Sequence, residues 1–117
     1  VSIGQVAGPD ASLISQPAQA IKAALAKANL AVEDVDLFEL NEAFAAVGCQ
    51  SMNDLGISDD IVNVNGGAIA IGHPVGVSGT RIVLTLLNEL QRRGGGTGAA
   101  ALCGGGGQGD AMIVRTV

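Results

Sequence analysis

The sequence predicts an α/β fold with a mostly parallel sheet, helices on both faces and an antiparallel last strand. Short apolar segments alternate with helical patterns along most of the chain, an order that implies a parallel sheet with right-handed crossovers. The chain has two Phe and no Tyr or Trp, so Val, Ile, Leu and Ala must build the core, which suits a buried parallel sheet. A tight Gly-rich turn before the last strand implies one antiparallel neighbour. We expect the order β-α-β-α-β-α-β-β in one domain, residues 1–117.

The first strand and helix occupy the first 29 residues. Residues 1–6 have the pattern of a strand without a leading turn or a charged start, so we expect a chain cut from a longer protein. After a turn at residues 8–10, Ser15 and Pro17 mark a helix start, because proline is tolerated in the first turn. Asn29 is expected to end that helix.

The second strand, residues 35–40, leads into a helix from residue 42 to about residue 54, with Asn41 as a suitable N-cap. This helix is rich in Ala and apolar on nearly all sides, so we expect it to be buried. Cys49, in the middle of the helix, is expected to be part of the core.

The third strand, residues 61–64, is expected to run into a loop that contains five glycines and the only histidine. A helix over residues 77–92 follows, with an apolar stripe on one side and Arg81 on the polar side. Residues 97–103 and 110–117 are predicted to be the last two strands, joined by a glycine turn.

The composition limits the possible partners. With 48% hydrophobic and 15% charged residues the chain is globular. A net charge of −5 with six Lys and Arg argues against nucleic acid or a membrane surface as partner. No apolar run approaches the roughly 18 residues of a membrane-spanning helix. Two cysteines are too few for a disulfide framework, so we expect a reducing, cytoplasmic location.

Three polar side chains follow the ends of predicted strands. Asn41 follows residues 35–40, His73 follows residues 61–64, and Cys103 closes residues 97–103. If these strands are parallel, the three residues emerge at the same sheet edge, where ligand sites form in open α/β sheets. Glycines around His73 allow the backbone to turn tightly, and Pro74 restricts it further, so the ring is held in position.

Each of these residues also has a simpler interpretation. A single histidine is more often a structural residue than a catalyst, and Asn41 alone is most simply an N-cap. Cys103 alone is most simply a small buried hydrophobe. The Gly-rich surroundings of His73 and Cys103 favour a functional role for both.

Three other motifs are rejected. The segment 104–109 matches G-x-G-x-x-G but joins two strands and opens no helix, so it is not a dinucleotide fingerprint. The segment 72–79 resembles a phosphate loop only in its glycines, because no Lys follows. Two Cys and one His, widely separated, do not predict a zinc site, and we expect no metal.

Three motifs together resemble the C-terminal half of a thiolase. They are Asn41-Glu42-Ala43-Phe44, Gly72-His73-Pro74 and Cys103-Gly104-Gly105-Gly106, and the similarity extends over essentially all 117 residues. The resemblance implies a thiolase-like half fold and Claisen chemistry that joins or splits acyl-CoA.

The resemblance also implies a role for each motif residue. His73 would activate a nucleophilic cysteine and line an oxyanion hole, in which Asn41 holds a water. Cys103 would be the acid and base that moves the α-proton of the acyl group. The backbone N–H of Gly105 would contribute to a second oxyanion hole.

Substrates and partners follow from the same resemblance. Coenzyme A and acyl-CoA would be substrates, with no covalently bound cofactor, and Ala43 and Phe44 would face the pantetheine arm. The nucleophilic cysteine of thiolases lies in the N-terminal half, which we expect to be absent here. We therefore expect an inactive chain that needs an N-terminal thiolase half as partner, and a homo-oligomer at full length. Gly104, where many members carry a bulkier apolar residue, is expected to loosen the Cys103 loop.

Two functions compete. One is a part of an acetyl-CoA acetyltransferase or 3-ketoacyl-CoA thiolase; the other is a non-catalytic thiolase-like interaction domain. The intact set of Asn41, His73 and Cys103 favours the enzyme. A reactive Cys103 of low pKa would distinguish the two.

Overall fold

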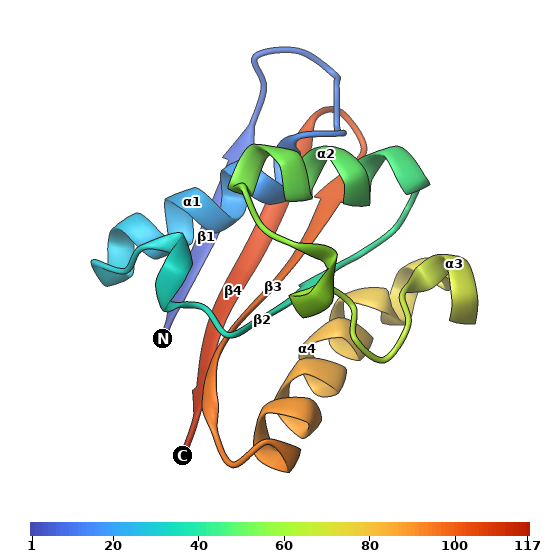
Figure 1. Ribbon diagram of the computed structural model, residues 1–117. Coiled ribbons are helices and arrows are strands. Elements are labelled where there is room, and N and C mark those ends of the chain that lie inside the picture. Colours follow the sequence, from blue (N-terminus) through green and yellow to red (C-terminus); the bar gives the residue numbers. More distant parts are fainter.

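A computed structural model describes residues 1–117 and contains one sheet with helices packed on both of its faces (Figure 1). Among its helices, none combines the length and the hydrophobicity that crossing a membrane would need. The elements in chain order are β1 (Ser2–Ala7), α1 (Gln16–Ala28), the 3-10 turn η1 (Val32–Asp34), β2 (Leu37–Leu40), α2 (Ala45–Leu55), the 3-10 turn η2 (Asp59–Ile61), α3 (Ala68–Ile71), α4 (Val75–Arg92), β3 (Gly96–Gly104) and β4 (Gln108–Thr116).

The sheet has the strand order β1-β4-β3-β2. Strands β2 and β3 are parallel, whereas β4 is antiparallel to both β3 and β1. Three strands therefore point in one direction and the last strand in the other, which confirms the predicted α/β class with an antiparallel last strand. Because β4 lies between β1 and β3, most of the ladders are nevertheless antiparallel.

The two faces of the sheet carry separate hydrophobic clusters. Helix α1 packs on β1, β4 and β3, and its cluster includes Ile21, Phe38 and Ile113. Helix α4 packs mainly on β3 and β2, and its cluster includes Ile82 and Leu86. Burial of this apolar surface is the main driving force for both packings. The predicted placement of helices on both faces is confirmed.

Helix α1 forms as its sequence predicts. Pro17 occupies the first turn, where no backbone N–H is needed. Asn29 ends the helix in the left-handed conformation, with φ of 53°. The helix lies so close to β1 that a Cβ atom at Gly4 would be 2.1 Å from the carbonyl oxygen of Ala20. Only glycine fits at that crossing.

The predicted strand at residues 61–64 is wrong. The segment forms η2 and then a single parallel bridge between Val62 and Phe38. Asn63 adopts φ of 48°, and its side-chain amide bonds the backbone N–H and the C=O of Leu40 at 2.8 and 2.9 Å. A side chain therefore takes the place of a backbone ladder beside β2. The short helix α3, also unpredicted, follows in the expected loop.

Two predictions about α2 are also wrong. The helix begins at Ala45 instead of residue 42, with Phe44 at the N-cap position, so Asn41 is not its cap. Only one side of α2 is buried, and Cys49 is exposed and is not a core residue. Residues 41–44 instead form a bent, non-helical connection, in which the backbone N–H of Ala43 donates to the carbonyl oxygen of Asn41 at 2.9 Å and the Asn41 side chain reaches His73.

Candidate active site

The C-terminal ends of β2 and β3 lie side by side because the two strands are parallel. Leu40 pairs with Ala101, and the backbone N–H of Asn41 donates to the carbonyl oxygen of Ala101 at 2.9 Å. Cys103 lies two residues further along β3. Residues 62 positions apart in the sequence thus come to one edge of the sheet.

A cleft of about 340 Å³ opens at this edge. Five of the predicted site residues line it, together with four apolar or glycine neighbours; the lining residues are Leu13, Ala43, Phe44, His73, Val75, Leu102, Cys103, Gly104 and Gly105. The sixth predicted residue, Asn41, is only 1% exposed and contacts the ring of His73. The structure therefore brings all six residues to one place, whereas their roles stay predictions.

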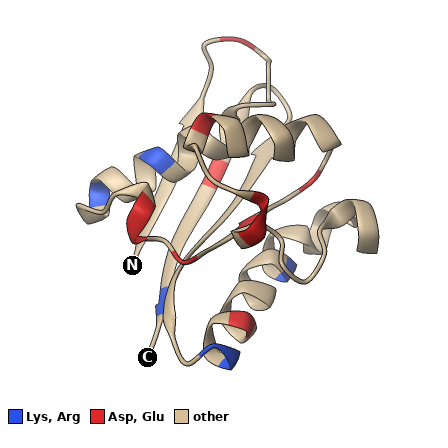
Figure 2. Cartoon of the chain, in the orientation of Figure 1, with Lys and Arg blue, Asp and Glu red and all other residues tan.

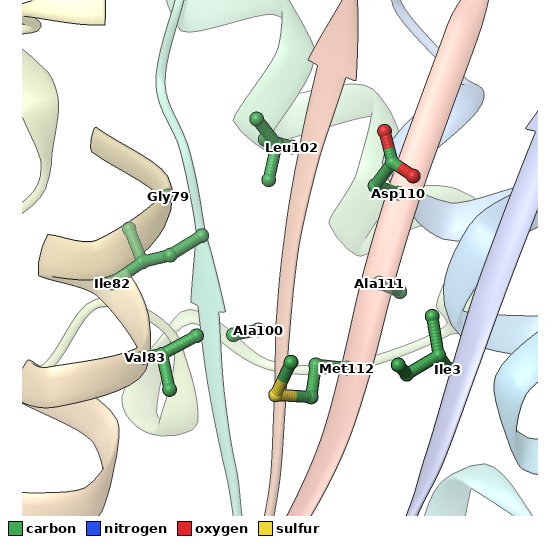
Figure 3. A pocket seen from close by; sticks show the side chains of 9 residues that line it. All are labelled: Ile3, Gly79, Ile82, Val83, Ala100, Leu102, Asp110, Ala111 and Met112. Atoms are coloured by element: carbon green, nitrogen blue, oxygen red, sulfur yellow. The ribbon is translucent and has the colours of Figure 1, made fainter. Parts of the chain in front are cut away.

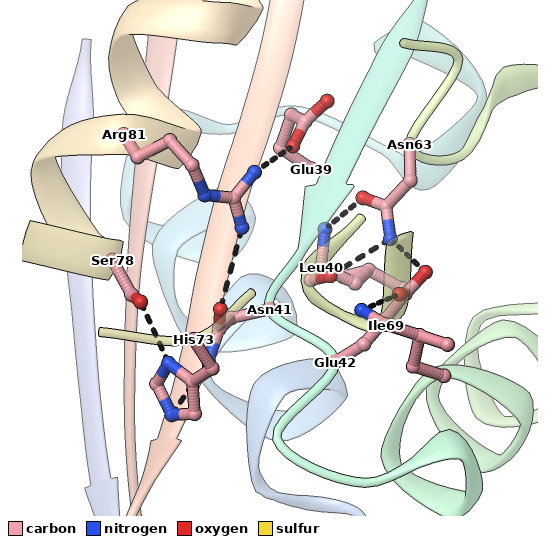
Figure 4. A network of polar contacts seen from close by, with 9 residues as sticks. All are labelled: Glu39, Leu40, Asn41, Glu42, Asn63, Ile69, His73, Ser78 and Arg81. Carbon is pink, nitrogen blue, oxygen red and sulfur yellow. Dashed lines mark hydrogen bonds and ion pairs between the residues drawn. The ribbon is translucent and has the colours of Figure 1, made fainter. Parts of the chain in front are cut away.

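His73 lies between α3 and α4 and is exposed to solvent. Gly72 ends α3 with φ of 96°, a conformation that L side chains rarely adopt, and so lets the chain turn toward α4. The Nδ1 atom of His73 lies 2.6 Å from Oγ of Ser78, and Nε2 lies 3.4 Å from Nδ2 of Asn41 (Figure 4). Both ring nitrogens therefore have partners, and the ring orientation is fixed.

A buried polar network continues behind Asn41. Nη2 of Arg81 donates to Oδ1 of Asn41 at 3.5 Å, and Nη1 of Arg81 lies 3.9 Å from Oε2 of Glu39 (Figure 4). Burial raises the pKa of Glu39 to about 7; the Arg81 charge opposes this rise in pKa, and the nearby charge of Glu42 adds to it. The cleft thus rests on a carboxyl group that titrates near neutral pH.

Cys103 is half-buried on the cleft wall. Burial raises the pKa of its thiol, and a backbone hydrogen bond opposes this only in part. The thiolate of Cys103 is consequently less populated at neutral pH than that of an ordinary cysteine. Beside it, Gly105 has open space around its α-carbon, so its backbone is accessible from the cleft.

The Glu42 carboxylate joins the chain after β2 to the loop before α4. One oxygen accepts a hydrogen bond from Nδ2 of Asn63 at 2.8 Å, and the other accepts one from the backbone N–H of Ile69 at 3.0 Å. Gly67 allows this approach, because a Cβ atom there would lie 2.2–2.4 Å from the carboxyl atoms of Glu42. The loop that carries His73 is therefore tied to the segment that carries Asn41.

Comparison with protein families decides the relationship. The family described as "Thiolase, C-terminal domain" matches residues 1–116. The chain belongs to the thiolase family. The resemblance seen in three short motifs is thereby confirmed over the whole chain, and the chain corresponds to a thiolase C-terminal domain.

Individual thiolases agree with this assignment. Proteins named "Probable acetyl-CoA acetyltransferase" from Mycobacterium leprae and Mycobacterium tuberculosis are each 60% identical, over 97% and 96% of this chain. A Rattus norvegicus protein named "Acetyl-CoA acetyltransferase, cytosolic" is 59% identical over 85% of this chain. The chain spans 29%, 28% and 25% of the length of these three relatives.

No contact was predicted from the sequence for five residues that hold the cleft in place: Glu39, Glu42, Asn63, Ser78 and Arg81. The sequence contained one signal for Glu39, because a carboxyl group inside the apolar strand Leu37–Leu40 needs a buried partner. The helical pattern put Arg81 on the polar side of α4, whereas its side chain is only 17% exposed and faces Glu39. Periodicity alone does not show which polar residue turns inward.

Proposed function

We propose that this chain is the C-terminal part of an acetyl-CoA acetyltransferase, which carries out Claisen condensation and thiolysis of acyl-CoA. The observation that carries the proposal is the single cleft lined by His73, Cys103 and Gly105, with Asn41 bonded to the histidine ring. The names of the mycobacterial and rat relatives support the same activity. The rat name also supports a cytoplasmic location.

His73 is the base in this proposal. A neutral imidazole takes the proton from a cysteine thiol supplied by the remainder of the thiolase, and the resulting thiolate attacks the acyl thioester. The ring becomes an imidazolium in that step and returns its proton later. Its exposed position, held from both nitrogens, supports the role.

Asn41 and Gly105 stabilise oxygen atoms that gain negative charge. Asn41 acts through its amide group and the water that it holds, and Gly105 acts through its backbone N–H. A donor of this kind typically lowers the barrier by about 3–4 kcal/mol when it is fixed before the reaction. The burial of Asn41 and its contact with Arg81 provide that fixation.

Cys103 removes the α-proton in condensation and returns it in thiolysis. A thiol works as a base only when its pKa is close to the working pH. Burial raises the pKa of Cys103 in this chain, so the opposing stabilisation of its thiolate must come from the remainder of the enzyme or from the bound thioester. This requirement supports the proposal that the chain alone is inactive.

Coenzyme A binds as a substrate in this proposal, with its pantetheine arm along Ala43 and Phe44. Phe44 is 61% exposed and forms an apolar wall of the cleft. The lining residues include no Lys or Arg, and the basic residues of the chain lie on α1, on α4 and the residue after it, and on β4 (Figure 2). We assign the phosphate groups of coenzyme A to the remainder of the thiolase.

The partner in this proposal is the N-terminal thiolase half, and it covers an open apolar surface. Helix α4 covers β2 and β3, but on the same face of the sheet β1 and β4 leave Ile3 and Met112 exposed. An apolar cleft of about 270 Å³ lies there between α4 and the sheet (Figure 3). Exposed apolar patches of this kind are typical of interfaces. By family resemblance, we extend the proposal to a homo-oligomer of the full-length protein.

Thiolysis of acetoacetyl-CoA by a full-length thiolase with this chain as its C-terminal domain tests the proposal. We expect Cys103→Ser and His73→Ala each to lower kcat by about 100-fold or more, because each removes a proton-transfer group. Cys49→Ser is the matched control, because Cys49 is exposed on α2 and does not line the cleft. Equal rates for Cys103→Ser and Cys49→Ser would reject the proposal and favour a non-catalytic interaction domain.

A further inference from the structure

We propose that Arg81 and Ser78 are positioning residues that fix His73 in the tautomer with its proton on Nδ1. The lone pair of Nε2 then faces the amide of Asn41. The inference rests on a series of polar contacts from Arg81 to the carbonyl oxygen of Pro74, and the groups at its two ends determine the direction of every hydrogen bond between them. Figure 4 shows the contacts from Arg81 to Ser78.

The series of polar contacts begins at the guanidinium group of Arg81, which can only donate hydrogen bonds. Its Nη2 lies 3.5 Å from the Oδ1 of Asn41, its one hydrogen-bond partner. Arg81 is held in place by the buried Glu39, at 3.9 Å from Nη1. The opposite orientation of Asn41 would place amide N–H groups against a cation, so the amide oxygen faces Arg81.

The amide nitrogen of Asn41 must therefore face His73. It lies 3.4 Å from Nε2, and an amide NH₂ can only donate. Nε2 consequently accepts and carries no proton. The two contacts around Asn41, at 3.4 and 3.5 Å, are longer than typical hydrogen bonds, so each is weak, but both require the same orientation of the amide group.

The series of polar contacts ends at the carbonyl oxygen of Pro74, which can only accept hydrogen bonds. The Ser78 hydroxyl donates to it at 3.1 Å, which leaves the Ser78 oxygen free to accept from Nδ1–H of His73 at 2.6 Å. In the alternative tautomer, Nε2–H would face the Asn41 amide, two donors at 3.4 Å. Ser78 would also have to turn its proton away from Pro74.

The consequence for catalysis rests on the proposed function. With Nδ1–H bonded to Ser78, the lone pair of the ring is on Nε2, where it can take a thiol proton by giving up only the 3.4 Å contact with Asn41, without the ring reorienting. The hydrogen bond of one ring nitrogen sets the state of the other. Arg81 and Ser78 touch no reacting atom and act only through Asn41 and His73.

The test is ¹⁵N NMR of the 117-residue chain with labelled histidine, which gives one pair of ring signals because His73 is the only histidine. The spectra are recorded at the high-pH end of a titration series, where the shifts of the two ring nitrogens no longer change with pH and report the tautomer directly. The same chain in denaturant gives the ratio for a free ring. We expect the Nδ1–H form to dominate only without denaturant. An Nε2–H majority without denaturant, or the same ratio of tautomers with and without denaturant, would overturn the inference.

Variants assign the effect to the two positioning residues. Ser78→Ala should lose most of the Nδ1–H preference and Ser78→Thr should retain it, because Thr also carries a hydroxyl that can bond the Pro74 carbonyl. Thr80→Ala, which removes an exposed hydroxyl from the same helix, is the matched control and should change nothing.

The paired change Glu39→Gln with Arg81→Met removes the cation without leaving a buried charge, and it should lower the preference as well. If Ser78→Ala and the paired change both keep the wild-type ratio, the proposal is wrong. No substrate is present in these measurements, so a failure of thiolysis would leave this result intact.

Discussion

Glu39 is a carboxyl group with almost no access to water. It is 2% exposed, its Oε2 accepts no hydrogen bond, and its nearest cation, Arg81, lies 3.9 Å away. An ion pair at this distance replaces only part of the lost hydration. The pKa of Glu39 is therefore raised to about 7, because burying the neutral, protonated carboxyl group costs less free energy than burying the carboxylate.

This pKa predicts how stability depends on pH. The folded chain holds the Glu39 proton between pH 4.5 and 7, whereas the unfolded chain has lost it, so stability falls as pH rises through this window. We expect a loss on the order of 2 kcal/mol, allowing for partial screening of the pair by solvent. Glu39→Gln should remove this loss, whereas Glu33→Gln on η1 should keep it. Urea unfolding at about pH 5 and about pH 8 measures it; equal pH dependence in wild type and Glu39→Gln would contradict the account.

Single residues were predictable from the sequence where a motif names them. Asn41 and Cys103 follow the ends of the parallel strands β2 and β3, so the order of elements is enough to bring these two together. His73 was placed at the same edge by a strand at residues 61–64 that does not form, and the contacts of Glu42 and Asn63 hold its loop there instead. The contacts of Arg81 and Ser78 were not predictable, because they depend on how α4 is rotated against β2. Helical periodicity predicts the rotation of α4 about its axis only to within about 100°, the angle between successive residues.

At the scale of elements, the loop between η2 and α4 is held by side chains and hardly at all by backbone ladders. Asn63 bonds Leu40, and Glu42 bonds both Asn63 and the first turn of α3. An apolar segment such as residues 61–64 reads as a strand from composition alone, yet Asn63 in the left-handed conformation ends any pairing. We call the hydrogen bonds of Glu42 with Asn63 and Ile69 the Glu42 clamp. Because the clamp holds the Glu42 side chain, it favours a non-helical conformation for residues 41–44, and α2 begins only at Ala45.

The clamp predicts the effect of one methyl group. Gly67→Ala places a Cβ atom against the Glu42 carboxylate and must displace it from Ile69 and Asn63. We expect a loss of about 1–3 kcal/mol, the usual cost of breaking hydrogen bonds to a charged group. Gly79→Ala has open space inside α4 and should instead stabilise by roughly 0.5–1 kcal/mol. Urea unfolding compares the two, and a Gly67→Ala variant as stable as the parent would refute the role of the clamp.

At the scale of the whole molecule, the position of β4 decides which surface stays open. The glycine turn predicts the pairing of β3 with β4, but the pairing of β4 with β1 joins segments more than 100 residues apart and has no local signal. With β4 between β1 and β3, α1 covers β1 and β4 from one side, whereas α4 packs mainly on β3 and β2 on the other and leaves Ile3 of β1 exposed. The open side, with Ile3 and Met112, is where we place the remainder of the thiolase.

The central claim is that the cleft of His73, Asn41 and Cys103 becomes catalytic when a second part of the enzyme completes it. The most direct test is the rate of acetoacetyl-CoA thiolysis after this chain is mixed with a separately produced N-terminal thiolase segment. A charge at Met112, as in Met112→Lys, should prevent assembly, whereas Ala26→Lys on the exposed side of α1 should not. We predict no thiolysis from either part alone and measurable thiolysis from the mixture. A complex that assembles without any thiolysis, or thiolysis by this chain alone, would contradict the account.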